Sequence, residues 1–287
     1  MRYKVGLAQC DAQLGDVEAN LATHAESIVL AAAEGVGLLV FPELSASGYL
    51  LQDMVSDVSM RAEDERFAAL SSRAEGMSIC VGGIEESPTH SQYISCFLLE
   101  GGAVRHVHRK AYLACYGVFD EARYVGSGNR FRAVDSAVGR IGLSICEDSW
   151  HPSAVELLLL DGADLIVVQA ASPVRDLREG RLPQNAQTWM DTLRTYARLY
   201  GAYIAFCNRV GTEDGLVFWG NSILIGPEGD TVVEAPPYDA ALVVGEVDTE
   251  RVRQARLNNP VLRDERIDLT MRELDRIRGE QRRLGDA

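Results

Sequence analysis

The chain has 287 residues, of which 47% are hydrophobic, and its 28 Lys and Arg residues against 42 Asp and Glu residues give a formal net charge of −14. This composition is typical of a folded α/β protein and excludes an intrinsically disordered one. The acidic excess and the lack of any run of basic residues argue against a nucleic-acid partner and against binding to an anionic membrane surface.

Targeting signals and disulfides are not expected either. No apolar run reaches the ~18 residues that a transmembrane helix needs, and the N-terminal segment turns acidic where a signal peptide would stay apolar. The six cysteines are scattered, without a C-x-x-C pair, at positions 10, 80, 96, 115, 146 and 207. We therefore expect a soluble cytoplasmic protein with reduced thiols.

Ten short apolar runs have the length and the Val, Ile, Leu and Phe content of β-strands. Many of them lack polar alternation, which indicates strands that are buried on both faces of a sheet. In chain order the runs are 3–9, 37–42, 78–84, 94–99, 104–109, 140–146, 164–170, 202–208, 221–226 and 241–247.

Two helices are predicted between these strands. Residues 17–34 follow Asp16, a candidate N-cap, and place four apolar side chains on one face, Leu21, Ile28, Val29 and Ala32. Residues 186–200 end before Gly201 and carry a stripe formed by Trp189, Leu193, Tyr196, Ala197 and Tyr200. Both helices are expected to pack against a sheet.

Two segments align without gaps, GVGLLVFPELS at 35–45 and GADLIVVQAAS at 162–172. Each follows a helical segment, so a helix–strand unit is expected to occur twice, in a layered fold with helices outside a sheet. No Pro- or Ser-rich linker divides the chain, and we expect a single domain over residues 1–250. Residues 251–287 are charged and helical in composition, and we expect them to form an arm that packs on a neighbouring subunit.

Three ionisable residues follow predicted strands, namely Glu43, Lys110 and Cys146. Ligands bind at the carboxyl ends of strands in an α/β sheet, so these side chains can converge on one crevice. A carboxylate can take the thiol proton, while an ammonium lowers the thiol pKa from ~8.5 and stabilises an oxyanion. Taken singly, each residue has an ordinary structural explanation: a buried core cysteine, a solvated loop glutamate and a surface lysine.

The joint pattern resembles the nitrilase superfamily of carbon–nitrogen hydrolases, whose members carry a Glu–Lys–Cys triad in this chain order. The three segments that match are FPELSASGYLLQDM (41–54), HRKAYLACYGVFDEARYVGSG (108–128) and GLSICEDSWHP (142–152). Two more, AQCDAQLGDVEANL (8–21) and NRVGTEDGLVFWGNSILIGPEGD (208–230), resemble the family's first strand and late hairpin. The resemblance covers about residues 3–250.

The resemblance implies a four-layer αββα sandwich that pairs into a homodimer or a multiple of it. It assigns Glu43 as general base, Cys146 as nucleophile and Glu121 as a second acid, with Lys110 and the N–H of Glu147 at the oxyanion. The implied reaction is hydrolysis of a C–N bond in a small carboxamide or ureido substrate through a cysteine thioester, with release of ammonia. It needs neither a metal nor an organic cofactor.

Within the superfamily, the C-E-D-x-W motif that begins at Cys146 looks like the glutaminase domain of glutamine-dependent NAD synthetases. That resemblance places Tyr116 and Trp150 in a glutamine pocket and Ser172 at the amino-acid end of the substrate. The S-G-G-x-D-S motif of the fused synthetase domain is absent, so two functions stay open. One is a general small-amide hydrolase, including a ureido hydrolase, because the late hairpin resembles that of N-carbamoyl-amine amidases. The other is a stand-alone glutaminase that gives ammonia to a separate synthetase partner.

Other classes of protein fit the sequence less well. A metal hydrolase is suggested only by His106 and His108, which have no third ligand at a fixed spacing. The sequence has no G-x-S-x-G motif of a serine hydrolase, and GSGNRF (126–131) lacks the third glycine of a dinucleotide fingerprint. A catalytically inactive binding protein on the same fold is a further alternative, which reaction of Cys146 with an amide-mimicking electrophile would exclude.

Overall fold

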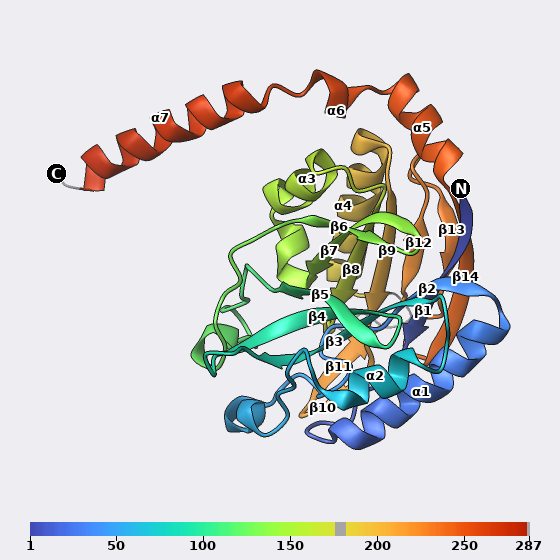
Figure 1. The fold of residues 1–287 in the computed structure, drawn as a ribbon. Coiled ribbons are helices and arrows are strands. Elements are labelled where there is room, and N and C mark those ends of the chain that lie inside the picture. Colours follow the sequence, from blue (N-terminus) through green and yellow to red (C-terminus); the bar gives the residue numbers. More distant parts are fainter. Residues whose placement is uncertain (176–181, 286–287) are drawn as a thin grey trace.

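The computed structural model describes residues 1–175 and 182–285, and its centre is formed by two six-stranded sheets (Figure 1). The strands of the first sheet are β1 (Arg2–Gln9), β2 (Val36–Val40), β3 (Ser78–Glu86), β4 (Gln92–Glu100), β5 (Ala103–Arg109) and β14 (Ala241–Asp248). Those of the second are β6 (Ala133–Ser136), β7 (Gly139–Ile145), β8 (Leu165–Ala170), β9 (Tyr203–Asn208), β12 (Ile223–Ile225) and β13 (Thr231–Glu234). A separate hairpin pairs β10 (Val210–Glu213) with β11 (Leu216–Trp219).

The two sheets have the same internal arrangement. The first has the order β14-β1-β2-β3-β4-β5 and the second β6-β7-β8-β9-β12-β13. In each, three parallel strands are flanked by one antiparallel strand on one side and two on the other. The predicted repeat segments contain β2 and β8, the middle strands of the two parallel triplets. The predicted repetition of a helix–strand unit is therefore confirmed.

Helices cover the outer face of each sheet and make the fold four layers deep (Figure 1). Helices α1 (Val17–Ala33) and α2 (Glu65–Ser71) lie on the first sheet, and α3 (Pro152–Leu160) and α4 (Gln184–Tyr200) lie on the second. Strand β8 shows why the layers form: Leu165 and Val167 belong to the core between the sheets, and Ile166 and Val168 to the core under α3 and α4. The predicted α/β sandwich is confirmed.

Helix α1 begins as predicted, because the Asp16 side chain accepts a hydrogen bond from the N–H of Ala19. Its predicted apolar face is partly wrong: Leu21 and Ile28 are buried, but Val29 is 53% exposed and Ala32 is exposed as well. Two polar residues take part in the buried face instead, as the complete set shows: Val17, Asn20, Leu21, His24, Ile28 and Ala31. The Asn20 amide bonds to backbone groups of neighbouring loops, and the His24 ring lies on that of Phe41, so a pattern of apolar residues alone could not locate this face.

Helix α4 has the predicted stripe, with Trp189, Leu193, Tyr196 and Ala197 buried, and it ends at Gly201 in the left-handed conformation, with φ of 56°.

All ten predicted strands are present. The strands β6 and β13 were not predicted, because each has only four residues and most of them carry exposed or half-buried side chains. The strands β10 and β11 form a hairpin within 208–230, the segment in which the resemblance places the late hairpin of the family.

The C-terminal region begins with α5 (Thr249–Asn258), which packs on the body through the buried side chains of Val252 and Ala255. Arg256 of the same helix also forms an ion pair with Asp164 of the body, at 2.7 Å. After α6 (Val261–Asp264), the helix α7 (Ile267–Gly285) extends away from the rest of the molecule (Figure 1). Leu262 of α6 still packs against the core under α4, so the predicted arm leaves the body only after α6.

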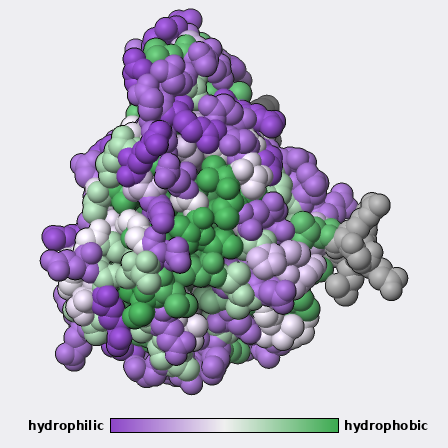
Figure 2. Space-filling model, turned by 90° about the vertical axis from the view of Figure 1, so that its right-hand side faces the viewer, coloured by the Kyte–Doolittle hydropathy of each residue, from purple (hydrophilic) through white to green (hydrophobic). Residues whose placement is uncertain are grey.

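The face of the molecule where β13 and β14 lie is largely hydrophilic, but an apolar patch stands near its middle (Figure 2). The described residues include no helix that is long and apolar enough to cross a membrane. All six cysteines are free thiols, as predicted, and Cys10, Cys80, Cys96 and Cys207 are buried. The cytoplasmic location stays a prediction.

Candidate active site

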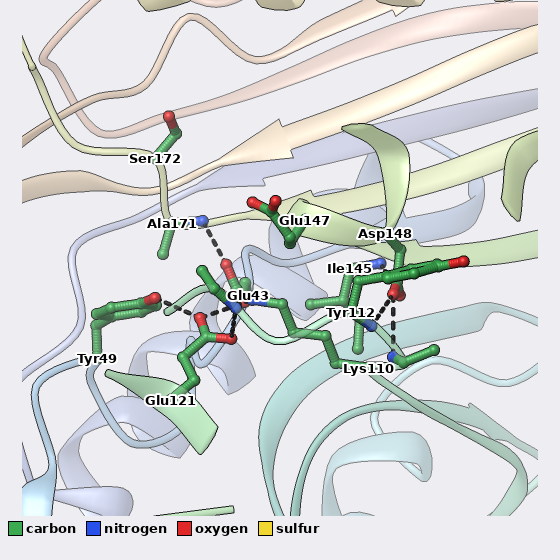
Figure 3. Close-up of polar contacts among 12 residues, drawn as sticks. Glu43, Tyr49, Lys110, Tyr112, Glu121, Ile145, Glu147, Asp148, Ala171 and Ser172 are labelled. Carbon is green, nitrogen blue, oxygen red and sulfur yellow. Dashed lines mark hydrogen bonds and ion pairs between the residues drawn. The ribbon is translucent and has the colours of Figure 1, made fainter. Parts of the chain in front are cut away.

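The predicted triad comes from both sheets. Glu43 follows β2 and Lys110 follows β5 in the first sheet, whereas Cys146 follows β7 in the second and starts the short helix η3 (Cys146–Trp150). The Nζ of Lys110 lies 2.7 Å from Oε1 of Glu43 (Figure 3). Cys146 is near enough that the charges of both residues act on its thiol. The structure thus brings the three predicted residues together.

Glu43 is held by backbone groups of both sheets. Its turn lies directly against Gly82 of β3, where a Cβ would come within 2.3 Å of the Pro42 carbonyl oxygen, so only glycine allows this approach. On the other side, the N–H of Ala171 donates to Oε2 of Glu43 at 2.9 Å. The Gln169 amide donates to the Phe41 carbonyl at 2.7 Å and ties β8 to the same turn. The carboxylate is therefore fixed in position before any ligand arrives.

Glu121, in the helix η2 (Glu121–Arg123), completes the surroundings of the lysine. Its Oε1 lies 2.7 Å from Nζ of Lys110 and accepts the hydrogen bond of the Tyr49 hydroxyl, while its Oε2 accepts the N–H of Ala114 at 2.9 Å (Figure 3). Lys110 is fully buried, and Glu43 and Glu121 are only 1% and 7% exposed. One ammonium thus balances two buried carboxylates.

Electrostatics keep the Lys110 ammonium charged. Burial would lower the pKa of Lys110, but Glu43 and Glu121 outweigh it and hold that pKa well above its ordinary value. Burial raises the pKa of the Glu43 carboxyl, although the Lys110 ammonium opposes the rise and the Glu121 carboxylate adds to it. Glu43 is therefore a stronger base than a solvated glutamate, beside a cation that stays protonated.

The thiol of Cys146 behaves differently from the expectation. Desolvation raises its pKa well above the ordinary value, the Glu43 carboxylate raises it further, and Lys110 opposes these effects only in part. Lys110 does act to lower the thiol pKa, as expected, but desolvation and the Glu43 carboxylate outweigh it, so the net pKa lies above the ordinary value and not below it. The resting thiol keeps its proton, and a base must remove it.

A strained turn presents Cys146. Strand β7 ends at Ile145, η3 starts at once, and Cys146 has a φ of 43°, in the left-handed region that a non-glycine residue enters at a cost of about 1–3 kcal/mol. The neighbouring Asp148 holds this turn, because its buried carboxylate accepts the N–H of Ile145 at 3.1 Å and faces Nε2 of His108 at 3.0 Å. Strain of this kind is common at sites where a nucleophile is exposed at a strand end.

Asp148 also joins the cysteine segment to the lysine segment. Its Oδ1 accepts the N–H groups of Ala111 at 3.0 Å and Tyr112 at 2.9 Å, the two residues after Lys110 (Figure 3). One carboxylate thus sets the relative position of Lys110 and Cys146. Sequence reasoning included Asp148 only as a letter of the C-E-D-x-W motif, and this positioning role was missed.

Tyr49 is a second residue whose part was missed, although it lies in the first matching segment. Its hydroxyl holds Glu121, and its own backbone is held by Glu213, which accepts the N–H groups of Tyr49 at 3.0 Å and Leu50 at 2.5 Å. Glu213 is in turn paired with the buried Arg209 at 2.7 Å. This chain of contacts fixes the side of the site opposite Asp148.

The four residues predicted at the substrate, Tyr116, Glu147, Trp150 and Ser172, lie in two groups, and Trp189 joins the two members of the second. The Tyr116 hydroxyl donates to the Glu147 carboxylate at 2.7 Å, and the Arg175 guanidinium lies 4.9 Å from the centre of the Tyr116 ring. The rings of Trp150 and Trp189 meet edge to face, with their centres 4.8 Å apart. The indole N–H of Trp189 donates a hydrogen bond to the Ser172 hydroxyl at 3.2 Å. The Ser172 side chain points away from Glu43 (Figure 3). Contacts of these residues with a substrate stay a prediction.

The two histidines considered as metal ligands, His106 and His108, have different surroundings. His108 is engaged with Asp148, and His106 is half-buried on the same strand. Across residues 1–175 and 182–285, no group of three or more His, Cys, Asp and Glu side chains is arranged to hold a metal ion.

Comparison with known proteins places these features in a family. The family model named carbon-nitrogen hydrolase matches residues 4–257. The glutamine-dependent NAD(+) synthetase of Thermotoga maritima is 31% identical over 268 residues, which are 90% of this chain and 44% of that protein. The N-carbamoylputrescine amidase of Arabidopsis thaliana is 26% identical over 270 residues, 88% of this chain and 89% of that protein. The chain therefore spans less than half the length of this synthetase, but most of the length of the amidase.

Solved structures agree on the fold. A carbon–nitrogen hydrolase from Helicobacter pylori superimposes with a TM-score of 0.86 at 24% identity, over 96% of this chain and 99% of that one. The glutamine-dependent NAD+ synthetase of Acinetobacter baumannii superimposes with a TM-score of 0.77 at 26% identity, over 88% of this chain and 47% of that one.

Proposed function

This chain belongs to the carbon–nitrogen hydrolase family, and from that premise we propose that it cleaves a C–N bond of a small carboxamide or ureido compound. The observation that carries the proposal is the buried cluster in which Lys110 lies 2.7 Å from both Glu43 and Glu121, beside Cys146. A surface lysine or a core cysteine would need no such arrangement. The product of the first step is a thioester at Cys146, and ammonia or an amine leaves.

The geometry suits a two-step acyl transfer. Glu43 takes the thiol proton while the sulfur attacks the carbonyl carbon, and the negative charge on the carbonyl oxygen is stabilised by Lys110 and the N–H of Glu147. The C–N bond then breaks, and the leaving nitrogen takes the proton that Glu43 holds. A water molecule that gives its proton to Glu43 attacks the thioester and releases the acid, which restores the thiol. Glu121 keeps Lys110 charged and oriented throughout.

A second candidate is a glutaminase that supplies ammonia to a separate synthetase. It is favoured by the 31% identity to the synthetase of Thermotoga maritima, of which this chain matches 44%. Two groups of opposite charge also lie beside Tyr116, namely the Glu147 carboxylate and the Arg175 guanidinium. Such a pair can bind the ammonium and carboxylate of an amino-acid substrate.

We expect the protein to release ammonia from at least one compound in a panel of glutamine, ω-amides and N-carbamoyl amines. The Cys146→Ala protein serves as the blank in a coupled ammonia assay, because it lacks the thiol and is expected to keep the fold. Glutamine turnover at a rate well above the other compounds would favour the glutaminase. A folded wild-type protein that releases no ammonia from any of them would contradict the proposed activity.

We also propose that the protein forms a homodimer or a multiple of it, in which α7 packs on a neighbouring subunit. One side of α7 carries apolar side chains that are exposed in the single chain, Ile267, Met271, Leu274 and Ile277. The acidic net charge is screened beyond about 8 Å at physiological salt, so it does not oppose contacts between apolar surfaces.

Truncation after Glu265 is expected to weaken this association, since it removes α7 and leaves the packed helix α5 in place. Light scattering at micromolar concentration measures the mass of each form. The variant Met271→Ser/Leu274→Ser should behave like the truncation, whereas Arg272→Ser/Arg276→Ser, on the opposite side of the helix, should not. A full-length chain that stays monomeric would show the assembly proposal to be wrong.

A further inference from the structure

An open cavity of about 530 Å³ lies along β5 and the segment 129–132, outside the cluster of Glu43, Lys110, Glu121 and Cys146. Its volume is typical of sites for small molecules. Its charged and titratable lining residues are Glu85, His106, His108, Arg109, Arg130 and Arg132. Three guanidinium groups around one cavity are unexpected in a chain whose net charge is −14.

One of the three arginines is neutralised within the protein. Arg109 forms a two-point ion pair with Glu85, at 2.6 Å and 2.7 Å, and its guanidinium lies 4.1 Å from the centre of the Tyr93 ring. Glu85 is buried, and its carboxylate also accepts the Ser95 hydroxyl at 3.0 Å. The only acid in the lining is therefore fully engaged.

The other two arginines are not paired. Arg130 and Arg132 are exposed and make no hydrogen bond or ion pair with any residue in 1–175 or 182–285. Arg132 acts electrostatically on Asp161, but that carboxylate is already paired with Arg140 at 3.0 Å and accepts the N–H of Ala133 at 2.8 Å. Two guanidinium groups thus remain free to bind a ligand at the cavity.

We propose that this cavity binds a small anionic molecule through a phosphate or carboxylate group held by Arg130 and Arg132. Both groups match the fork of a guanidinium, which gives paired, charge-assisted hydrogen bonds. The cavity is much larger than a single phosphate ion, so it accommodates a metabolite that carries the anionic group. His106, on the adjoining strand, offers a ring without a hydrogen-bond partner in the described part of the chain.

The position of the cavity connects it to the catalytic cluster. His108 forms part of its wall, and the same ring faces Asp148 at 3.0 Å, the carboxylate that holds the backbone on both sides of the site. Arg109 directly precedes Lys110. A ligand in the cavity therefore contacts residues that position the cluster, without entering it.

Calorimetric titration of the full chain tests this site without any knowledge of the substrate. The probes are pyrophosphate, inorganic phosphate and succinate, each compared with sodium chloride at the same ionic strength. We expect binding by at least one probe with a Kd of roughly 1 mM or below. Tighter binding of pyrophosphate than of succinate would identify a phosphate ligand, and the reverse order a carboxylate ligand, and either result supports the site.

Single substitutions show whether the two arginines carry the binding. Arg130→Gln and Arg132→Gln should each raise the Kd by about fivefold or more, and melting curves should stay unchanged because both side chains are exposed. Arg105→Gln is the matched control, since Arg105 is an exposed arginine on β5 that does not line the cavity. Titrations without heat above the chloride control, or an equal loss of affinity in Arg105→Gln, would overturn the proposal.

Discussion

Replacing Cys146 by alanine is expected to abolish turnover, with a loss of more than about 10³-fold in kcat, as for other acyl-transfer enzymes that lose their nucleophile. Cys146→Ser should lose nearly as much, because a serine hydroxyl does not form an accessible anion at neutral pH. The raised pKa of the Cys146 thiol sharpens this expectation, since in the proposed mechanism even the thiol depends on Glu43 to remove its proton. Steady-state rates of ammonia release measure the loss, and circular dichroism checks that both variants fold.

The other cysteines provide the control. Cys10, Cys80 and Cys207 are buried in the core, and their replacement by alanine should change stability and leave kcat unaltered. Cys115 is exposed, so a Cys115→Ala background is needed before an amide-mimicking electrophile can report on Cys146 alone. If a core cysteine proved as essential as Cys146, the assignment of the nucleophile would be wrong. Absence of labelling at Cys146 would favour the inactive binding protein.

The strands could be predicted where burial fixes the residue type. A strand buried on both faces, such as β8 with all six residues buried, needs apolar side chains throughout and therefore stands out in the sequence. The short strands β6 and β13 do not need apolar side chains throughout, because most of their residues are exposed or half-buried. The buried face of α1 was missed in part for a related reason, since Asn20 and His24 take part in it.

The candidate site could be predicted only at residues whose chemistry is fixed by a motif. Glu43, Lys110, Cys146 and Glu121 lie in matching segments, and the structure brings the first two and Glu121 into direct contact. What holds them depends on tertiary contacts between distant positions. The N–H that binds Glu43 comes from Ala171, 128 residues away, and it is a backbone group that leaves no trace in the sequence.

The net direction of the thiol pKa could not be predicted either. A lysine near a cysteine suggests a lowered thiol pKa when only the two are considered. In the fold, burial and Glu43 act in the opposite direction and exceed the effect of Lys110. The net shift of the thiol pKa depends on how deeply the thiol is buried and on how many charged groups lie near it, and only the structure gives both. The proposed roles of Glu43 as base and Lys110 as oxyanion partner therefore rest on the whole cluster and not on any single pair.

Lys110→Met is expected to reduce both stability and rate, by about 3–5 kcal/mol in the free energy of unfolding and by about 10²-fold or more in kcat. The substitution leaves the carboxylates of Glu43 and Glu121 buried without their shared cation, so one of them must take up a proton on folding. Because folding raises the pKa of Lys110 above its ordinary value of 10.5, its stabilising contribution is complete below that pH and is lost only as the pH rises through the folded value. Urea denaturation at neutral pH and steady-state kinetics measure the two losses.

A double variant separates the two roles of this lysine. Lys110→Met/Glu121→Gln removes the repulsion between two buried carboxylates, so we expect it to recover much of the lost stability. It should recover none of the lost rate, because no cation remains beside the oxyanion. Lys4→Met is the matched control: Lys4 is the only other lysine in the sequence, and its exposed ammonium donates to the Glu34 carbonyl at 2.7 Å. Recovery of turnover together with stability in the double variant would mean that Lys110 is only a structural counter-charge to Glu43 and Glu121, and its place at the oxyanion would be wrong.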